Sequence, residues 1–350
     1  MASTPPVRRT QLTDVAAAAG VSLATVDRVL HGRTGVHATT VEQVLAAVQR
    51  LEYRADPAAT RLARARSSHS IAVLLPSGTN SFVTSLADQV TSLGPWLAEQ
   101  RLTATVLRVN VFAPEALARH LATMRRQYVA VVVMGIDHPL VRAAIDDLCA
   151  NGTTVITLVS DVPSSRRAHY VGIDNVAAGR TAATLLGRFL GSAPAKHRVG
   201  IVLGSHALRD HAERLFGFQQ VMAADHPQVT LLPALEGHDD SDRTKPLVAD
   251  LLKREKNLAG LYSIGAGNRG IQSALVDSGR ASQVVWICHE LTPHARRALL
   301  DGVADAVINQ DAGHELRSAF RLALARLNKE RVVPEQERIR IDIFVKENLP

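Results

Sequence analysis

Apolar residues recur at three- and four-residue intervals through the first fifty residues, and this spacing predicts three short helices. They span residues 12–19, 23–31 and 41–51. Gly20 is placed to end the first helix, because glycine tolerates the left-handed backbone of a helix stop. Ser22 is placed to cap the second helix by accepting a hydrogen bond from a free backbone N–H. The pattern is that of a helix-turn-helix.

The second predicted helix has an apolar and a polar face. The apolar face is expected to point inward and comprises Val26, Val29 and Leu30. Ala24, Thr25 and Arg28 share the other face, so a small, flat and basic surface points outward. Such a surface suits the major groove of DNA, although an ordinary helix hairpin shows the same pattern.

The third predicted helix supplies a core for the first two. Thr39 and Glu42 have the spacing of a capping box ahead of it. Its expected core positions are Val41, Val44, Leu45, Val48 and Leu51.

From residue 71 the pattern changes to apolar strands that alternate with amphipathic helices, which predicts parallel sheets covered on both faces. The first set of strands is 71–76, 103–112, 129–136, 153–160 and 169–173, and the second is 198–204, 229–235, 258–265, 284–290 and 304–310. Intervening helices include residues 82–100 and 175–190. Two similar sets in succession indicate two α/β lobes with a cleft between them.

Polar and aromatic side chains follow these strands at their carboxyl ends, where ligands of parallel-sheet folds bind. The candidates for ligand contact are Asn80, Phe82, Asp137, Arg166, Arg214, Asn268, Glu290 and Gln310. Each taken singly is more readily explained as a capping or surface residue. Their common location therefore carries the prediction.

Charge and composition agree with a DNA-binding unit joined to a ligand-binding domain. The chain has 350 residues, 46% hydrophobic content and a net charge of +7. Residues 1–66 hold nine arginines against five acidic residues, so much of the positive charge lies where phosphate contact would use it. Cys149 and Cys288 form no disulfide framework, and the apolar runs are too short to span a bilayer. We expect a soluble, cytoplasmic protein.

Residues 11–66 resemble the headpiece and hinge helix of the lactose repressor (LacI/GalR) family. The match runs in unbroken register through Asp14-Val15-Ala16, Ala19-Gly20-Val21-Ser22, Thr25-Val26, Arg28-Val29-Leu30, Thr40, Val44, Tyr53, Ala59 and Leu62. The chain departs from the family pattern at Asp27, His37 and Asp56, and an aspartate at position 27 would repel phosphate unless it were paired.

The resemblance implies that residues at the start of the second helix face DNA bases, and that Leu62 inserts into the minor groove at the centre of a palindromic site. The DNA-binding residues expected on this basis are Ser22, Leu23, Ala24, Thr25, Arg28, Arg33 and Leu62.

From Ile71 to about Val345 the chain also resembles the sugar-binding domain shared by these repressors and the periplasmic ribose-type binding proteins. Arg214 in the R-x-x-G-F stretch, Asp137 and Gln310 match ligand-holding positions of that family. Gly267-Asn268 stands where an Asn-Asp pair is usual, and Glu290 stands where an aspartate is usual. The resemblance implies a polyhydroxylated ligand, with its sugar class left open.

Together these features predict an all-α helix-turn-helix headpiece followed by an α/β bilobed domain of the periplasmic-binding-protein type I. The headpiece is assigned to residues 1–54, a hinge helix and linker to 55–68, and an effector-binding and dimerisation domain to 69–350. The N-lobe is expected at about 69–166 and 293–327, and the C-lobe at about 167–292 and 328–350.

The loop GAGNRG, residues 265–270, supports an alternative function. It fits G-x-G-x-x-G between a strand and a helix, and Glu290 ends the next strand, as in an NAD-dependent oxidoreductase. The loop follows the eighth predicted strand rather than the first, and no catalytic pair accompanies it. His289, Glu290 and His294 also miss the spacing of the helical zinc motif. We therefore expect no enzyme, cofactor or metal.

The function expected from the sequence is that of a transcriptional regulator, most simply a repressor. It would bind a palindromic operator as a homodimer and respond to a small sugar or polyol in the cleft. The sequence is compatible with an effector that releases the protein from DNA and with one that promotes DNA binding. It also leaves open whether dimers pair further and which operator sequence is bound.

Overall fold

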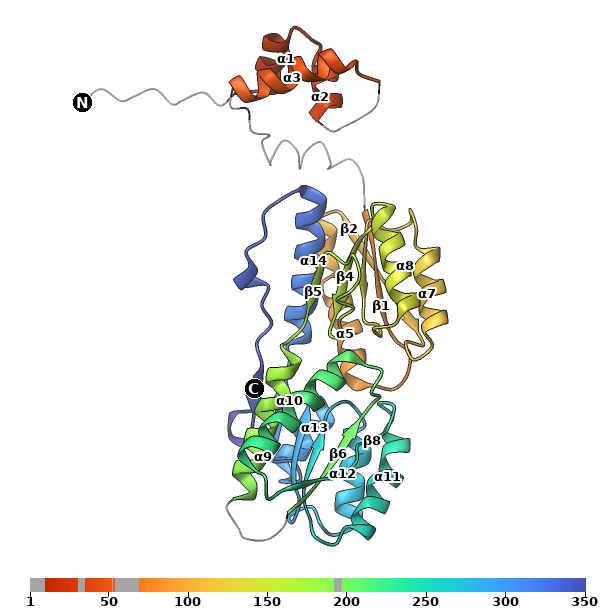
Figure 1. The fold of residues 1–350 in the computed structure, drawn as a ribbon, viewed down its shortest axis with the longest axis vertical. Helices are drawn as coiled ribbons and strands as arrows, with labels where there is room; N and C mark the ends of the chain where they lie inside the picture. Colours follow the sequence, from red (N-terminus) through yellow and green to blue (C-terminus); the bar gives the residue numbers. More distant parts are fainter. Residues whose placement is uncertain (1–9, 31–34, 52, 54–68, 192–196) are drawn as a thin grey trace, which may run out of the picture. The chain divides into compact units, whose positions relative to one another are not determined.

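The computed structural model describes residues 10–30, 35–51, 53, 69–191 and 197–350. The chain divides into two compact units, Met1–Ser67 and Ser68–Pro350 (Figure 1). The predicted hinge, residues 55–68, lies outside the described residues. Among the residues that are described, no helix is both long and apolar enough to cross a membrane.

The small unit contains three helices around one apolar cluster. They are α1 (Leu12–Ala19), α2 (Leu23–Leu30) and α3 (Ala38–Arg50). The buried cluster comprises Val15, Ala16, Val26, Val44 and Ala47. Gly20 ends α1 with a left-handed backbone (φ 66°), and the backbone N–H of Thr25 donates to Ser22 Oγ (3.2 Å). Both predicted helix boundaries at the turn are confirmed.

Two predictions for α3 are wrong. The helix begins at Ala38, and its N-cap His37 makes no side-chain capping bond, so Thr39 lies inside the helix rather than at a capping box. Leu45 is 51% exposed, and Ala47 takes the buried position instead. Val44 and Ala47 are three residues apart and share a face, whereas Leu45 is turned about 100° away from Val44.

The large unit begins with a parallel five-stranded sheet of order β2-β1-β3-β4-β5. Its strands are β1 (His69–Pro76), β2 (Leu102–Val109), β3 (Ala130–Val133), β4 (Thr154–Leu158) and β5 (His169–Val171). The helices of this first lobe are α5 (Ser81–Ser92), α6 (Gly94–Glu99), α7 (Pro114–Thr123), α8 (Pro139–Ala150) and α14 (Ala312–Asn328).

The second lobe holds a sheet of order β12-β11-β10-β9-β6-β7, with β8 paired to β6. Its strands are β6 (Arg198–Leu203), β7 (Thr230–Leu231), β8 (Leu235–Glu236), β9 (Leu258–Ser263), β10 (Val285–His289), β11 (Ala306–Asn309) and β12 (Asp342–Phe344), the last antiparallel to β11. Its helices are α9 (Asn175–Leu190), α10 (Arg209–Asp225), α11 (Ser241–Arg254), α12 (Asn268–Asp277) and α13 (Pro293–Leu300). Two short 3₁₀ helices, η1 (Pro334–Gln336) and η2 (Lys346–Asn348), flank β12.

Both faces of each sheet are buried. In β1, Ile71 and Val73 join the apolar cluster that contains α5 and α14, whereas Ala72 and Leu74 join the cluster that contains α7 and α8. Successive side chains of a strand point to opposite faces, so a strand covered on both sides must be apolar at every position. The same division separates Ile201 from Val202 in β6.

Prolines break two predicted elements. Residues 82–100 form α5 and α6 rather than one helix, because Pro95 lacks the N–H that a continuous helix needs and instead opens α6. Residues 229–235 form β7 and β8 rather than one strand, with Pro233 between them.

The chain crosses between lobes at positions different from those predicted. β5 belongs to the first sheet, so the first crossing follows Val171 and not residue 166. β11 belongs to the second sheet and α13 packs against it, so the return crossing comes at Gln310 and Asp311 and not at residue 293. α14 then packs on α5, β4 and β5.

Helices α9 and α10 approach each other through glycines. A Cβ atom on Gly179 would lie 1.9 Å from the carbonyl oxygen of Arg214, and one on Gly217 would lie 2.1 Å from the carbonyl oxygen of Val176. Neither position can hold a larger residue without moving backbone. This close contact sets the position of Arg214 on α10.

We predict that Gly179→Ala lowers the free energy of unfolding by roughly 1 to 3 kcal/mol, because the added methyl overpacks the helix contact. Alanine otherwise favours helices over glycine by about 1 kcal/mol, so the sign of the change tests the contact. Urea denaturation followed by circular dichroism gives the measurement. Gly94→Ala is the control, since its Cβ would meet nothing within 4 Å. Stabilisation by both substitutions would contradict the close approach.

Candidate functional site

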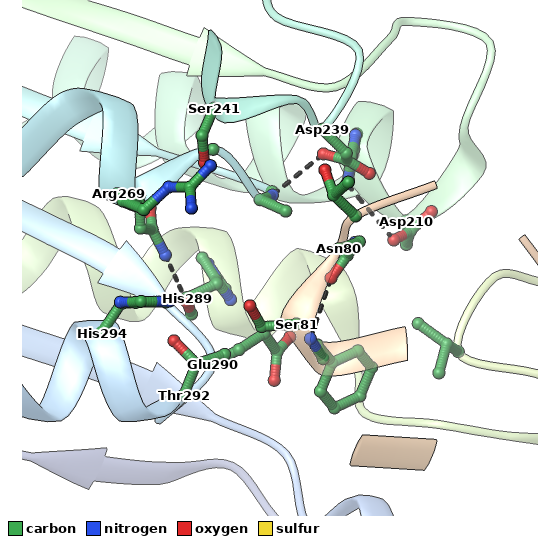
Figure 2. A pocket seen from close by; sticks show the side chains of 18 of the residues that line it. Asn80, Ser81, Asp210, Asp239, Ser241, Arg269, His289, Glu290, Thr292 and His294 are labelled. Carbon is green, nitrogen blue, oxygen red and sulfur yellow. Dashed lines mark hydrogen bonds and ion pairs between the residues drawn. The ribbon is translucent and has the colours of Figure 1, made fainter. Parts of the chain in front are cut away.

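A cavity with about 840 Å³ of space, partly open to solvent, lies between the two lobes of the large unit (Figure 2). Its walls come from segments that follow β1, β3, β4, β6, β8, β9, β10 and β11. These are carboxyl ends of parallel strands, as predicted.

Six of the eight predicted ligand-contact residues line this cavity. They are Asn80, Phe82, Arg214, Asn268, Glu290 and Gln310. The rule that ligands bind beyond strand ends therefore located six of the 21 residues that form the wall.

Arg214 lies at the base of the cavity and is only 1% exposed. Its Nε donates to Asn175 Oδ1 (2.8 Å), and its Nη1 donates to the carbonyl oxygen of Ile264 (2.9 Å). Nη2 lies 3.7 Å from Glu290 Oε1. Burial works to lower the pKa of Arg214, but the nearby carboxylates of Glu290 and Asp210 more than offset it and raise that pKa. The guanidinium is therefore a fixed positive charge in a dry site.

Glu290 opposes this charge from the end of β10. Gln310 Nε2 donates to its Oε1 (2.7 Å), while Oε2 has no hydrogen-bond partner among the described residues. Burial raises the pKa of the Glu290 carboxyl to about 7, against the opposing effect of Arg214. Its backbone is left-handed (φ 67°), a conformation that residues other than glycine seldom adopt.

Five buried polar atoms of cavity-lining residues have no hydrogen-bond partner within the described part of the chain. They are Asp210 Oδ1, Arg214 Nη2, His289 Nδ1, Glu290 Oε2 and Gln310 Oε1. Buried polar atoms in native proteins are nearly always hydrogen-bonded, so water or a ligand in the cavity is expected to supply the partners of these five. The mixture of donors and acceptors matches hydroxyl groups, which both donate and accept.

Asn268 and Asn80 line the cavity, but their amides also hold the surrounding loops. Asn268 Oδ1 accepts from Ser263 Oγ (2.7 Å), and its Nδ2 donates to the carbonyl oxygen of His289 (3.0 Å). Asn80 Oδ1 caps α5 by accepting from the backbone N–H of Phe82 (2.9 Å).

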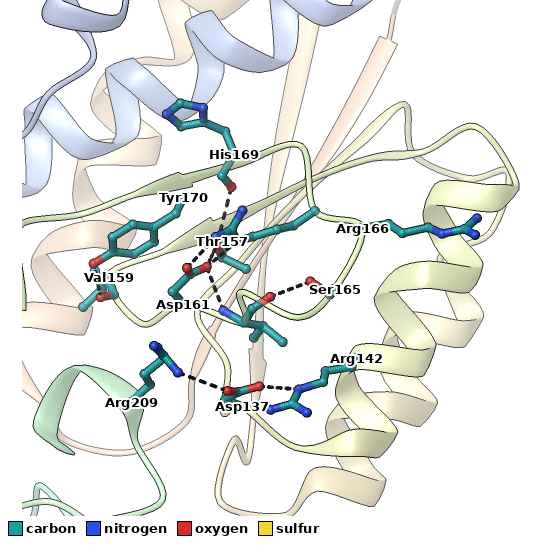
Figure 3. Close-up of polar contacts among 12 residues, drawn as sticks. Asp137, Arg142, Thr157, Val159, Asp161, Ser165, Arg166, His169, Tyr170 and Arg209 are labelled. Atoms are coloured by element: carbon teal, nitrogen blue, oxygen red, sulfur yellow. Dashed lines mark hydrogen bonds and ion pairs between the residues drawn. The ribbon is translucent and has the colours of Figure 1, made fainter. Parts of the chain in front are cut away.

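The other two predicted residues, Asp137 and Arg166, are not among those that line the cavity. Asp137 accepts from Arg142 Nε (2.6 Å) and from Arg209 Nη1 of the other lobe (3.4 Å), and the hydrogen bond from Arg142 lowers its pKa (Figure 3). Arg166 is exposed, and its backbone N–H donates to Asp146 Oδ1 (2.6 Å). The Asp137 carboxylate thus joins the two lobes.

Several wall residues were absent from the predicted set. They include Asp210, His211, Asp239, Arg269 and His289. One signal was available for Asp210, which lies four residues before Arg214 and therefore on the same face of α10. Asp239 comes from a loop after β8, a strand of two residues that the sequence pattern did not separate from its neighbour.

The predicted DNA-facing residues that are described lie on or before α2. Ser22, Leu23, Ala24 and Arg28 are exposed, with Leu23 at 47%. Thr25 is half-buried, and its Oγ1 lies 2.9 Å from Ser22 Oγ. Arg33 and Leu62 lie outside the described residues.

Two family models match this chain. Residues 71–331 match the model described as periplasmic binding protein domain, and residues 11–56 match that of bacterial regulatory proteins, lacI family. Both are binding or regulatory domains, so the oxidoreductase alternative is not supported. The GAGNRG loop instead forms part of the cavity wall between β9 and α12.

Two curated relatives resemble the N-terminal part of the chain. The HTH-type transcriptional regulator MalR of Streptomyces coelicolor is 44% identical over 81 residues, which is 23% of this chain and 22% of the relative. The ribose operon repressor of Bacillus subtilis is 46% identical over 74 residues, which is 21% of this chain and 22% of the relative. The chain thus matches about a fifth of the length of these relatives.

The large unit has the fold of solved solute-binding proteins. An ABC transporter solute-binding protein from Burkholderia graminis C4D1M, in complex with D-arabinose, superposes with a TM-score of 0.72 at 18% identity. The match covers 81% of this chain and 96% of that chain.

We predict that Glu290→Gln flattens the pH dependence of stability. The folded-state pKa of Glu290 is raised to about 7 from an ordinary 4.5, so its contribution is fully present below pH 4.5 and is lost as the pH rises through 7. Wild-type protein should therefore lose roughly 1 to 3 kcal/mol from this residue over that window. Urea unfolding at several pH values provides the comparison.

The pKa of the buried Glu315 carboxyl is raised by burial and then by the charge of Glu290, so Glu290→Gln alters it as well. Introducing Glu315→Gln into both proteins removes this second carboxyl, and the difference that remains isolates Glu290. Identical pH profiles for wild type and Glu290→Gln would show that this carboxyl stays ionised in the folded protein.

Proposed function

Because the chain belongs to the periplasmic binding protein domain family over residues 71–331, and residues 11–56 match the bacterial lacI regulatory family, we propose that it is a repressor controlled by a small sugar or polyol. It binds a palindromic operator as a homodimer through α2, and the effector occupies the cavity between the lobes. A protein with this function acts in the cytoplasm, where the DNA lies.

The observation that carries the effector proposal is the set of five unpartnered polar atoms in the cavity wall. A neutral polyol satisfies both kinds of atom, since each hydroxyl donates to a carboxylate and accepts from a guanidinium or imidazole. The wall contains the acidic residues Asp210, Asp239 and Glu290 against the basic Arg214 and Arg269, and this balance disfavours a strongly anionic ligand. The Burkholderia graminis protein with the same fold binds D-arabinose, which supports a monosaccharide here.

The DNA proposal rests on the exposed surface of α2. Leu23, Ala24 and Arg28 point away from the apolar cluster of the small unit, and the small side chain at 24 allows close approach to base edges. In this proposal Ser22 and Thr25 contact phosphate oxygens, Arg33 contacts phosphate, and Leu62 enters the minor groove.

The effector changes DNA affinity by changing the arrangement of the two lobes. Residues from both lobes line the cavity, so occupancy favours one arrangement of the lobes over another. Any resulting change in operator affinity is a coupling free energy, typically about 1 to 3 kcal/mol, and DNA changes effector affinity by the same factor.

A thermal-shift screen of the full chain tests the effector class. D-arabinose, D-ribose, D-xylose, a linear polyol such as ribitol, and D-ribose 5-phosphate form the panel. A neutral sugar or polyol should raise the melting temperature in proportion to the logarithm of its concentration. A response confined to the phosphorylated sugar would overturn the neutral class.

We predict that Asp210→Asn weakens binding of the responding sugar about tenfold and leaves operator affinity unchanged, because a charged acceptor is lost from the cavity alone. Isothermal titration measures the first quantity and fluorescence anisotropy with labelled DNA the second. Asp225→Asn, at the exposed end of the same helix, is the matched control and should change neither. Equal sugar affinity in the two variants would remove Asp210 from the site.

We predict that Arg28→Ala costs about 1 to 3 kcal/mol at one base position of an operator selected from a palindromic library, and relaxes base preference there. Arg50→Ala removes the same charge from α3 and should weaken binding to all sequences alike. Anisotropy titrations against every single-base variant of the operator make the comparison. Uniform weakening by Arg28→Ala would show that Arg28 contacts phosphate only.

A further inference from the structure

A buried tyrosine lies behind one wall of the cavity. Tyr262 on β9 is fully buried, does not line the cavity, and stacks on Phe218 with ring centroids 4.4 Å apart. Its hydroxyl lies 2.8 Å from Nε2 of His289, at the end of β10. His289 does line the cavity, so Tyr262 can act on a bound ligand only through His289 (Figure 2).

The hydrogen-bond pattern determines which atom donates between these two residues. Among the described residues, His289 Nε2 is the one partner of the Tyr262 hydroxyl. If Nε2 carried the proton, the phenol hydrogen would have no acceptor inside a closed apolar wall. A buried donor without an acceptor is expensive, so the hydroxyl donates to Nε2.

The other ring nitrogen, Nδ1, then carries the proton of the neutral imidazole. Nδ1 is buried and has no partner within the described chain, and the residue that bears it lines the cavity. Water or an effector can accept from it there, whereas neither can reach the phenol. This asymmetry favours one tautomer over the other.

The surroundings keep the ring neutral. Burial lowers the pKa of His289 well below its ordinary value, and Arg214 and His211 on α10 act in the same direction. Glu290 is adjacent in sequence, but its carboxyl is bound to Gln310. Asn268 holds the main chain of His289 by donating to its carbonyl oxygen, which restricts the ring position.

We propose that Tyr262 is a positioning residue for effector recognition: it fixes His289 in the Nδ1–H tautomer, so that the ring presents a hydrogen-bond donor to the cavity. The inference rests on the proposed effector site and extends it. His289 Nδ1–H and Arg214 Nη2 are the donors, and Asp210 Oδ1 and Gln310 Oε1 are acceptors. The effector atom that meets His289 is therefore an acceptor, such as a ring oxygen, a carbonyl oxygen or a hydroxyl oxygen, and an ammonium group is rejected there.

The tautomer can be measured in the free protein. Full-length protein labelled with ¹⁵N and ¹³C in histidine only is studied by two-dimensional NMR at neutral pH, and His289→Gln assigns the signal by difference. The expected spectrum has a protonated-type ¹⁵N shift at Nδ1 and an unprotonated-type shift at Nε2. Protonation at Nε2, or a pH-dependent average of charged and neutral forms near neutrality, overturns the proposal.

The tyrosine hydroxyl is tested by Tyr262→Phe, which keeps the stacked ring. The Nε2–H form of His289 should become populated in this variant. The control is Tyr170→Phe, because the Tyr170 hydroxyl donates to the carbonyl oxygen of Val159 (2.9 Å) and not to His289. An unchanged His289 spectrum in Tyr262→Phe contradicts the positioning role, and if that variant does not fold, the wild-type spectrum still decides the tautomer.

Effector affinity supplies a separate readout. Tyr262→Phe should weaken binding of the responding sugar from the D-arabinose, D-ribose and D-xylose panel by roughly tenfold, because the imidazole no longer presents a fixed donor. Unchanged affinity together with an altered tautomer would overturn the role in recognition. If no sugar in the panel binds, the sugar proposal fails, while the NMR spectrum of the free protein still tests the tautomer.

Discussion

The compensation of the buried Arg214 charge is the interaction on which the cavity depends. A charge removed from water must be compensated by nearby dipoles and opposite charge, and three separate elements provide this: Asn175 at the start of α9, the Ile264 carbonyl beyond β9, and Glu290 beyond β10. The glycine contact between α9 and α10 brings the first of these within reach. Removing any one of them would leave a charge in the interior, so the geometry of the cavity base and the stability of the second lobe are coupled.

The strands could be predicted well because a strand buried on both faces appears in the sequence as a continuous apolar run. The same uniform pattern carries no information on which sheet a strand joins. The apolar pattern of 169–171 or 306–309 says that each is a buried strand, but it does not say which sheet the strand joins. The lobe crossings therefore came out wrong, although the strands themselves were placed within a few residues. The elements interrupted by Pro95 and Pro233 were also predicted wrongly, although both prolines were visible in the sequence.

The strand-end rule found the cavity but not the role of every side chain. Asp137 follows a strand, as a ligand-binding residue would, yet its carboxylate accepts hydrogen bonds from Arg142 and Arg209. Those arginines lie on helices whose orientation the sequence pattern did not specify. The function of Asn80 as a helix cap is local and could have been anticipated. The importance of His289 depends on Tyr262, 27 residues away in sequence, and such a pairing exists only once two strands are laid side by side.

Glu290 occupies a backbone conformation that suits glycine, and its peptide is held there by two contacts. Its N–H donates to the Ile308 carbonyl (2.9 Å), and its carbonyl accepts from the Thr292 N–H (2.8 Å). A left-handed non-glycine residue costs the fold about 1 kcal/mol, and burying its carboxyl adds to that cost. Glycine at position 290 would relieve both costs, but it would leave the guanidinium of Arg214 without its opposing carboxylate. The strained backbone and the buried charge are therefore linked, and neither can be relaxed alone.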